Sequence, residues 1–164
     1  MSERMILGID PGIDGALALI NVHVRDLAEV VDMPYVEVRR NSTRKREVAP
    51  ALVGNLVKRW KPDVAVIERV SAMPGQGVTS MFSFGRSLGM IEGILAAHHI
   101  PVRYITPQEW KRVHGIPAGA PKDESRAAVM RLLPQHADRF ARKKDHGRAD
   151  AILIAAAYYE WAAA

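Results

Sequence analysis

The chain has 164 residues, of which 48% are hydrophobic and 25% are charged, and it contains no cysteine. This composition excludes disulfides, thiolate metal sites and cysteine nucleophiles, and it argues against a largely disordered chain. The formal charge of +5 at pH 7 favours a polyanionic partner, such as nucleic acid or an acidic membrane surface.

Neither end of the chain resembles a targeting or membrane segment. The N-terminus, MSERMILGID, has no signal-peptide pattern, and the apolar stretch 151–159 is far shorter than the ~20 residues that span a bilayer. We therefore expect no membrane partner and a cytoplasmic location, in the nucleoid or in a phage-infected cell. The length suits one compact domain over residues 1–164.

The first half of the chain is expected to form a strand meander followed by a helix. Residues 5–9, 16–20 and 27–31 are short apolar runs typical of strands, and the first run stops at the turn Asp10-Pro11-Gly12. A polar loop over 36–46 follows, and apolar residues then recur at helical spacing over 48–60.

The second half is expected to alternate between strands and helices. Strands are predicted over 64–67 and 102–105, helices over 80–98, 123–133 and 147–161, and loops over 71–79 and 115–121. Thr106 before Pro107 is a predicted helix N-cap. The order predicts an α/β fold in which helices flank a mixed five-stranded sheet.

Two carboxylates follow buried-strand signatures. Asp10 ends the first strand and Glu68 ends the strand over 64–67, and each begins a loop. Ligands gather at the carboxyl ends of neighbouring parallel strands, so the two acids would share one rim of the sheet. Each acid alone is better explained as a turn residue that ends a strand.

A third carboxylate strengthens the case for a site. Asp150 lies in a helix that is apolar all round, where an ionised carboxylate is costly unless it is paired or binds a metal. His146 lies four residues earlier on the same helical face, although it could also be a solvated residue at the helix start. Asp145 is either an N-cap or a fourth ligand.

Several acids that converge on one point repel each other unless a hard divalent cation binds them. Mg²⁺ prefers oxygen ligands, and two such ions about 4 Å apart can hydrolyse a phosphodiester. The sequence therefore predicts a phosphodiester-cleaving site with two Mg²⁺ ions and with no small-molecule cofactor.

These motifs resemble a known family. GIDPG (8–12), VIERV (66–70), TPQEWK (106–111), GIPAGAPK (115–122) and DHGRADAILIA (145–155) are similar to segments of the RuvC family of Holliday junction resolvases, in the RNase H-like superfamily. The resemblance spans almost the whole chain in the right order. It implies a homodimeric endonuclease that makes paired nicks in four-way DNA junctions with Mg²⁺, for which Mn²⁺ can substitute. Short resolvases of this type also occur in bacteriophages.

The resemblance also implies roles for individual residues. Asp10, Glu68 and Asp150 match the metal-binding acids of the family, and Lys122 matches its catalytically important basic residue. We assign the fourth metal position to His146, with Asp145 as the alternative. Family members often have a DNA-stacking aromatic residue just after the second acid. This chain has Ser71 there, with Met73 nearby as a replacement.

Basic residues could form the DNA-binding surface. They either hold phosphates or form solvated faces, and with Met73 the candidates are Arg39, Arg40, Arg44, Lys45, Arg46, Lys111, Lys143, Lys144 and Arg148. Gly85, Gly89 and Gly93 recur every four residues on one predicted helix. Such a stripe indicates close packing, either on the sheet or against the same helix of a second subunit.

Three other functions remain open. GIDPG also occurs in sugar kinases and actin-like ATPases, but those folds need a second domain that 164 residues hardly allow. A RuvC-like nuclease that acts on flaps or forks is a second alternative. A catalytically silent RNase H-like module that binds nucleic acid is a third, and the presence of all three acids argues against it.

Overall fold

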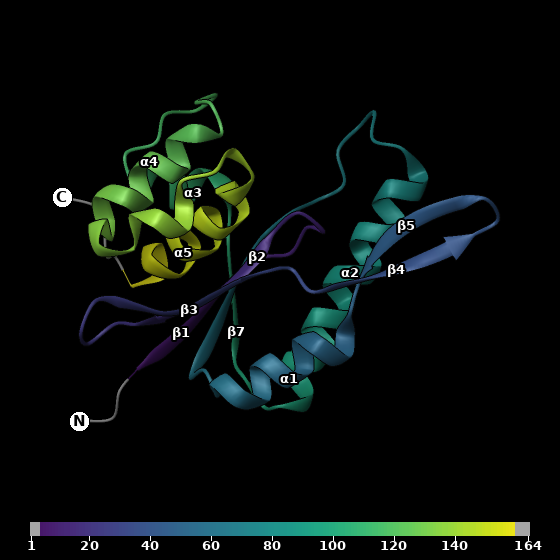
Figure 1. The fold of residues 1–164 in the computed structure, drawn as a ribbon, viewed down its shortest axis with the longest axis horizontal. Helices are drawn as coiled ribbons and strands as arrows, with labels where there is room; N and C mark the ends of the chain where they lie inside the picture. Colours follow the sequence, from purple (N-terminus) through teal and green to yellow (C-terminus); the bar gives the residue numbers. More distant parts are fainter. Residues whose placement is uncertain (1–3, 160–164) are drawn as a thin grey trace.

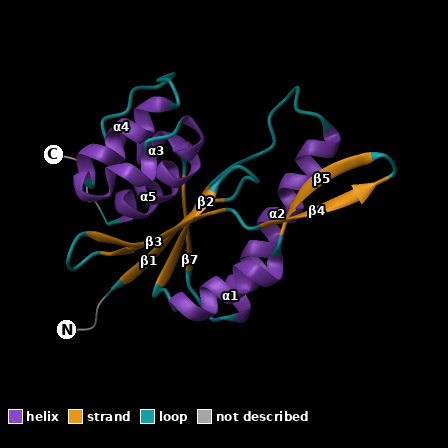
Figure 2. Ribbon diagram, in the orientation of Figure 1, coloured by secondary structure: helices purple, strands orange, loops and turns teal. Residues whose placement is uncertain are grey.

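The computed structural model describes residues 4–159, and its centre is a mixed five-stranded sheet with the order β3-β2-β1-β6-β7 (Figures 1 and 2). The strands are β1 (Met5–Asp10), β2 (Ala16–Asn21), β3 (Asp26–Asp32), β6 (Val64–Glu68) and β7 (Val102–Ile105). The first three form an antiparallel meander, while β1, β6 and β7 run parallel. The predicted fold class and strand positions are confirmed.

Helices cover both faces of the sheet (Figure 1). One face carries α3 (Pro107–Val113), α4 (Asp123–Leu132) and α5 (His146–Tyr158), and the other carries α1 (Pro50–Trp60) and α2 (Val78–Ala97). Alternate residues of β1 point to opposite sides: Ile6 joins the core under α5, whereas Leu7 and Ile9 join the core under α1 and α2. The central strand therefore contributes side chains to both cores.

Glycine lets α5 lie close to the central strand. A Cβ atom added to Gly8 would lie only 1.9 Å from the carbonyl oxygen of Ala151 and 2.8 Å from the Cβ of Ala155. The α5 residues from Ala151 to Ala157 are buried, as the all-round apolar pattern predicts. The predicted end of this helix, at residue 161, lies outside the described residues.

The predicted loop over 36–46 is wrong. The structure has a two-stranded hairpin there, β4 (Tyr35–Arg40) paired with β5 (Thr43–Val48), and it extends past α2 away from the main sheet (Figures 1 and 2). The turn between Arg40 and Thr43 contains Asn41 at φ 56°, a conformation that asparagine tolerates better than most residues. Most side chains of this hairpin are exposed on both of its faces, so its sequence shows little of the alternation of apolar and polar residues that predicts a strand.

The helix boundaries are close to those predicted. Thr106 caps α3: its side chain accepts a hydrogen bond from the backbone N–H of Glu109 at 3.2 Å. Two short 3₁₀ segments, η1 (Pro134–Phe140) and η2 (Lys143–Asp145), join α4 to α5. In residues 4–159, no helix is long and apolar enough to cross a membrane.

The glycine stripe of α2 does not pack on the sheet. Nothing lies within 4 Å of a Cβ added to Gly85, Gly89 or Gly93, and all three are exposed. The alternative in which these glycines allow tight packing on the sheet is therefore wrong. Phe82 on the same helix is 73% exposed, so this part of α2 presents an aromatic side chain beside an open strip of backbone.

Candidate active site

A cavity of about 340 Å³ opens at the carboxyl ends of β1 and β6. The parallel pairing of Ile9 with Ile67 brings the next residues, Asp10 and Glu68, to the same rim of the sheet. Helix α5 contributes Asp150 and His146 from one side. The complete lining is Asp10, Glu68, Pro107, Trp110, Lys111, Ile116, Ala120, Pro121, Lys122, Ser125, His146 and Asp150.

Asp10 is the most strongly perturbed of the acids. Burial, together with the charges of Glu68 and Asp150, raises its pKa to about 7. The backbone N–H of Gly12 donates a 3.3 Å hydrogen bond to Oδ1, which opposes part of this effect. Gly15 leaves room for the turn, because its Cβ would lie 2.2 Å from the backbone oxygen of Asp10.

Glu68 is oriented by a tryptophan. The indole N–H of Trp110 donates a 2.9 Å hydrogen bond to Oε1 of Glu68. Burial and the charge of Asp150 raise the pKa of Glu68, while the hydrogen bond from Trp110 lowers it. Trp110 is 1% exposed and belongs to the core under α5. Its hydrogen bond to the site carries no sequence signal and was not predicted.

Asp150 has one carboxylate oxygen without a partner. Burial raises its pKa, and a hydrogen bond from Ser125 on α4 together with the charge of His146 lowers it. Oδ1 of Asp150 is buried and has no hydrogen-bond partner among the described residues. A buried polar atom of this kind is costly unless something binds it. Ser125 is a site residue that the sequence reading missed.

The structure brings His146, but not Asp145, to the cavity. Asp145 is 1% exposed and is held by Arg142, whose guanidinium donates to Oδ1 at 2.8 Å. These contacts with Arg142 lower the pKa of Asp145 despite its burial. The position three residues before Asp150 is Gly147, whose Cβ would lie 2.5 Å from the backbone oxygen of Asp14. A metal-binding side chain therefore has no room at position 147. The neighbouring residue, His146, is the one that reaches the cavity.

The donor set suits a hard divalent cation. Carboxylate oxygens dominate it, and the unpartnered Oδ1 of Asp150 is available to a ligand. In residues 4–159, however, no three His, Asp or Glu side chains stand close enough together to enclose an ion as they are placed. The types of donor atom nevertheless fit such an ion.

Two of the predicted basic residues reach the cavity. Lys111 and Lys122 line it, and their charges lower the pKa of Asp150. Arg148 lies outside and forms an ion pair with Asp32, with its Nε 2.6 Å from Oδ1. Met73 is 64% exposed in the loop before α2 and does not line the cavity. The remaining predicted DNA-binding residues lie on the hairpin or in η2.

The fold is shared with structurally known resolvases. Thermus thermophilus RuvC in complex with a Holliday junction substrate matches over 96% of this chain and 94% of its own, with a TM-score of 0.66 at 20% identity. Fowlpox virus resolvase, solved with substrate Holliday junction DNA, matches over 94% of this chain and 98% of its own, with a TM-score of 0.51 at 16% identity. These likenesses identify the fold as RNase H-like.

Sequence relatives point to the same class. RuvC of Prochlorococcus marinus (strain MIT 9313) is 31% identical over 157 residues, which cover 92% of this chain and 94% of the relative. The chloroplastic Holliday junction resolvase MOC1 of Chlamydomonas reinhardtii is 37% identical over 95 residues, which cover 55% of this chain but only 10% of that longer protein. A nuclease of RNase H-like fold is therefore the class that fold and site define.

The family follows from a direct match. The family model described as crossover junction endodeoxyribonuclease RuvC matches residues 6–158. The chain belongs to the RuvC family of endodeoxyribonucleases.

Proposed function

We propose that this protein is a structure-selective endonuclease that resolves four-way DNA junctions by hydrolysing phosphodiester bonds. One observation carries the proposal: acids from β1, β6 and α5 line a single cavity together with two lysines, in a chain that matches the RuvC family model over residues 6–158. We further propose that residues 1–164 act as one nuclease domain, in the cytoplasm where the DNA is found.

Nucleases of the RuvC family use divalent metal ions. For this chain we propose two Mg²⁺ ions, replaceable by Mn²⁺, held by Asp10, Glu68, Asp150 and His146. When bound, such ions activate the attacking water and stabilise the charge on the leaving oxygen. The orphaned Oδ1 of Asp150 and the raised pKa of Asp10 support this role, since a cation would stabilise both carboxylates in their ionised form.

The protein residues position the reacting groups. Trp110 fixes one oxygen of Glu68, and Ser125 donates to the carboxylate of Asp150, so both acids are held by a hydrogen bond where they line the cavity. Lys122 and Lys111 place positive charge where the scissile phosphate would enter. The imidazole nitrogen of His146 can bind a cation or accept a proton from the attacking water.

Paired nicks require two active sites, and we propose that a homodimer supplies them. Helix α2 offers a suitable interface, because Gly85, Gly89 and Gly93 form an open strip that a second helix can approach closely. Phe82 and Val78, which are 73% and 84% exposed, extend this strip with apolar surface. Exposed side chains of that size commonly mark a protein contact.

A related nuclease that prefers flaps or replication forks would have the same cavity, and a silent module would bind DNA without cutting it. The test is incubation of the protein with a four-way junction, a flap, a fork and a linear duplex, each in Mg²⁺, Mn²⁺ or Ca²⁺. We expect symmetric paired nicks in the junction with Mg²⁺ or Mn²⁺ and binding without cleavage in Ca²⁺. Preferential cutting of flaps or forks would favour the second candidate, and binding without cleavage in every metal would favour the third.

A further inference from the structure

The β4–β5 hairpin has two faces that differ in what they contact. Cross-strand partners lie on the same face, so Glu37 with Arg46 and Arg39 with Arg44 form one face, while Val38 with Lys45 belongs to the other. Along β5, Lys45 and Glu47 are half-buried, whereas Arg44 and Arg46 are exposed. The hairpin thus has an inner face toward α2 and an outer face toward solvent.

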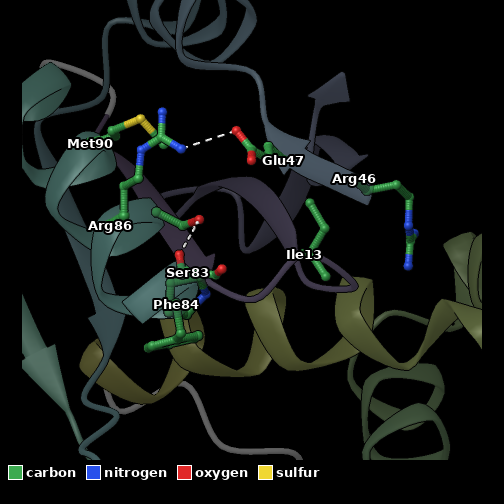
Figure 3. Close-up of a pocket in the computed structure, with 9 residues that line it drawn as sticks. Ile13, Arg46, Glu47, Ser83, Phe84, Arg86 and Met90 are labelled. Carbon is green, nitrogen blue, oxygen red and sulfur yellow. Dashed lines mark hydrogen bonds and ion pairs between the residues drawn. The ribbon is translucent and has the colours of Figure 1, made fainter. Parts of the chain in front are cut away.

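The inner face is fastened to α2. The amine of Lys45 donates a 2.6 Å hydrogen bond to the hydroxyl of Ser83, and Arg86 donates a 3.0 Å hydrogen bond to Glu47. Figure 3 shows Glu47 pointing toward Arg86 while its neighbour Arg46 extends the opposite way. These contacts hold the base of the hairpin in a fixed orientation, so that its outer face is presented on a supported arm.

The outer face is basic and leads toward the active site. Arg46 lies over the ring of Tyr35 and forms an ion pair with Asp14, in the loop that follows the catalytic strand β1. A groove of about 270 Å³ runs here, lined by Arg46, Lys144 and His146 among others. His146 also lines the catalytic cavity, so the groove and the cavity adjoin.

The acids of this groove are already neutralised. Asp14 is paired with Arg46, and Asp32 with Arg148, whose Nη2 lies 2.9 Å from Oδ2. Arg39 and Lys144 are exposed and make no ion pair with any of the described residues 4–159. On the outer face Arg44 lies near Glu37, with its Nη1 3.7 Å from Oε2, so Arg39 and Lys144 are what give this track positive charge without a partner acid. Such charge is complementary to a phosphate backbone.

We propose that the outer face of the hairpin, together with this groove, binds the sugar-phosphate backbone of the DNA arm that leaves the catalytic cavity past His146. This inference rests on the proposed nuclease function and extends it. The contacts are to phosphates and carry no base readout, because the residues available are arginine and lysine side chains at a solvent-exposed β-ribbon. The hairpin sets how firmly the junction is held, while the cavity cuts it.

The two faces allow a matched test. Arg39→Gln with Arg44→Gln removes two charges from the outer face, and Arg40→Gln with Lys45→Gln removes two from the inner face, so both variants have the same net charge. Binding to a fluorescent four-way junction would be titrated in Ca²⁺ over a range of salt concentrations. We expect the outer-face variant to bind about tenfold more weakly near 0.15 M salt and to flatten the salt slope by about 2.

The inner-face variant should change affinity and slope far less, and Arg39→Lys with Arg44→Lys should restore both. At saturating DNA the outer-face variant should cut at nearly the wild-type rate, because its residues do not touch the reacting atoms. Two results would overturn the hairpin inference while the wild type still cuts junctions: an unchanged salt slope in the outer-face variant, or an equal loss of affinity in both variants. In either case the nuclease function stands. If the wild type neither binds nor cuts branched DNA, both proposals are wrong.

Discussion

Each acid of the cavity is held by a different kind of neighbour: a backbone N–H for Asp10, an indole for Glu68 and a hydroxyl for Asp150. The acids themselves could be predicted from the sequence, because two follow strand signatures and the third interrupts an apolar helix. Trp110 and Ser125 could not, because side-chain hydrogen bonds between distant segments leave no local pattern. The pairing of Asp145 with Arg142 is local, and it explains why His146 is the residue that faces the cavity.

The first residue-scale prediction concerns Asp10→Asn in metal-free protein. With a folded-state pKa of about 7, Asp10 destabilises the folded protein increasingly as the pH rises from about 4 through 7. Below pH 4 the carboxyl is protonated in the folded and the unfolded state, so the substitution should have little effect there. At pH 8 it should raise the free energy of unfolding by on the order of 2 kcal/mol. Urea denaturation of both proteins in EDTA, below pH 4 and at pH 8, measures the difference in the free energy of unfolding. An equal effect of the substitution at the two pH values would refute the prediction.

The second prediction separates His146 from Asp145. His146→Ala should lose most Mg²⁺-dependent cleavage, and His146→Asp should regain part of it, because a carboxylate is a better Mg²⁺ ligand than imidazole. Asp145→Asn should mainly lower the melting temperature by weakening the contact with Arg142. Normal cleavage by His146→Ala and none by Asp145→Asn would reverse the assignment.

At the scale of elements, the main sheet and its helices were predictable because their apolar residues recur at period 2 or 3.6. The β4–β5 hairpin was not, because it buries little and its charged residues mask the alternation of Val36 and Val38 with polar neighbours. The turn residue Asn41 was the available signal. The close approach of α5 to β1 and to the β1–β2 loop also escaped the sequence, although Gly8 and Gly147 both mark it.

The prediction at this scale is that Gly147→Ala displaces the start of α5. Its Cβ would lie 2.5 Å from the backbone oxygen of Asp14, so either the helix or the loop must move. We expect a loss of roughly 1–3 kcal/mol in the free energy of unfolding and slower cleavage, because His146 and Asp150 lie on the displaced helix. Gly54→Ala in α1 is the matched control: its Cβ would make only an ordinary 3.9 Å contact with Ile94, so the free energy of unfolding should be unchanged or higher. Similar losses in both variants would show that close packing is not the cause.

The whole molecule has different surfaces available for DNA and for a second subunit. The cavity lined by the three acids adjoins the groove at His146, and Arg46 of the hairpin lines the same groove, whereas α2 presents glycines and exposed apolar side chains. Since the net charge is +5, DNA affinity should come largely from phosphate contacts. Holding a junction and cutting it twice would then depend on separate parts of the surface.

The prediction for assembly uses Gly89→Leu. Nothing lies within 4 Å of the added Cβ, so the folded monomer should tolerate leucine and gain up to about 1 kcal/mol in helix propensity. A partner helix packed on the strip would clash with the side chain. Light scattering should show a dimer for the wild type at micromolar concentration and a monomer for the variant, with an unchanged or higher melting temperature. A wild-type monomer that still makes paired nicks would contradict the dimer.

The central claim is that Asp10, Glu68 and Asp150 cut the DNA while the basic surface holds it, and one measurement addresses it most directly. Junction binding in Ca²⁺ and junction cleavage in Mg²⁺ would be measured side by side for Asp10→Asn, Glu68→Gln and Asp150→Asn. Each variant should bind the junction within about threefold of the wild type, because phosphate contacts by Lys and Arg dominate affinity, and should cut it at least about 100-fold more slowly. Normal cleavage by any one of the three would remove that acid from the site and contradict the account.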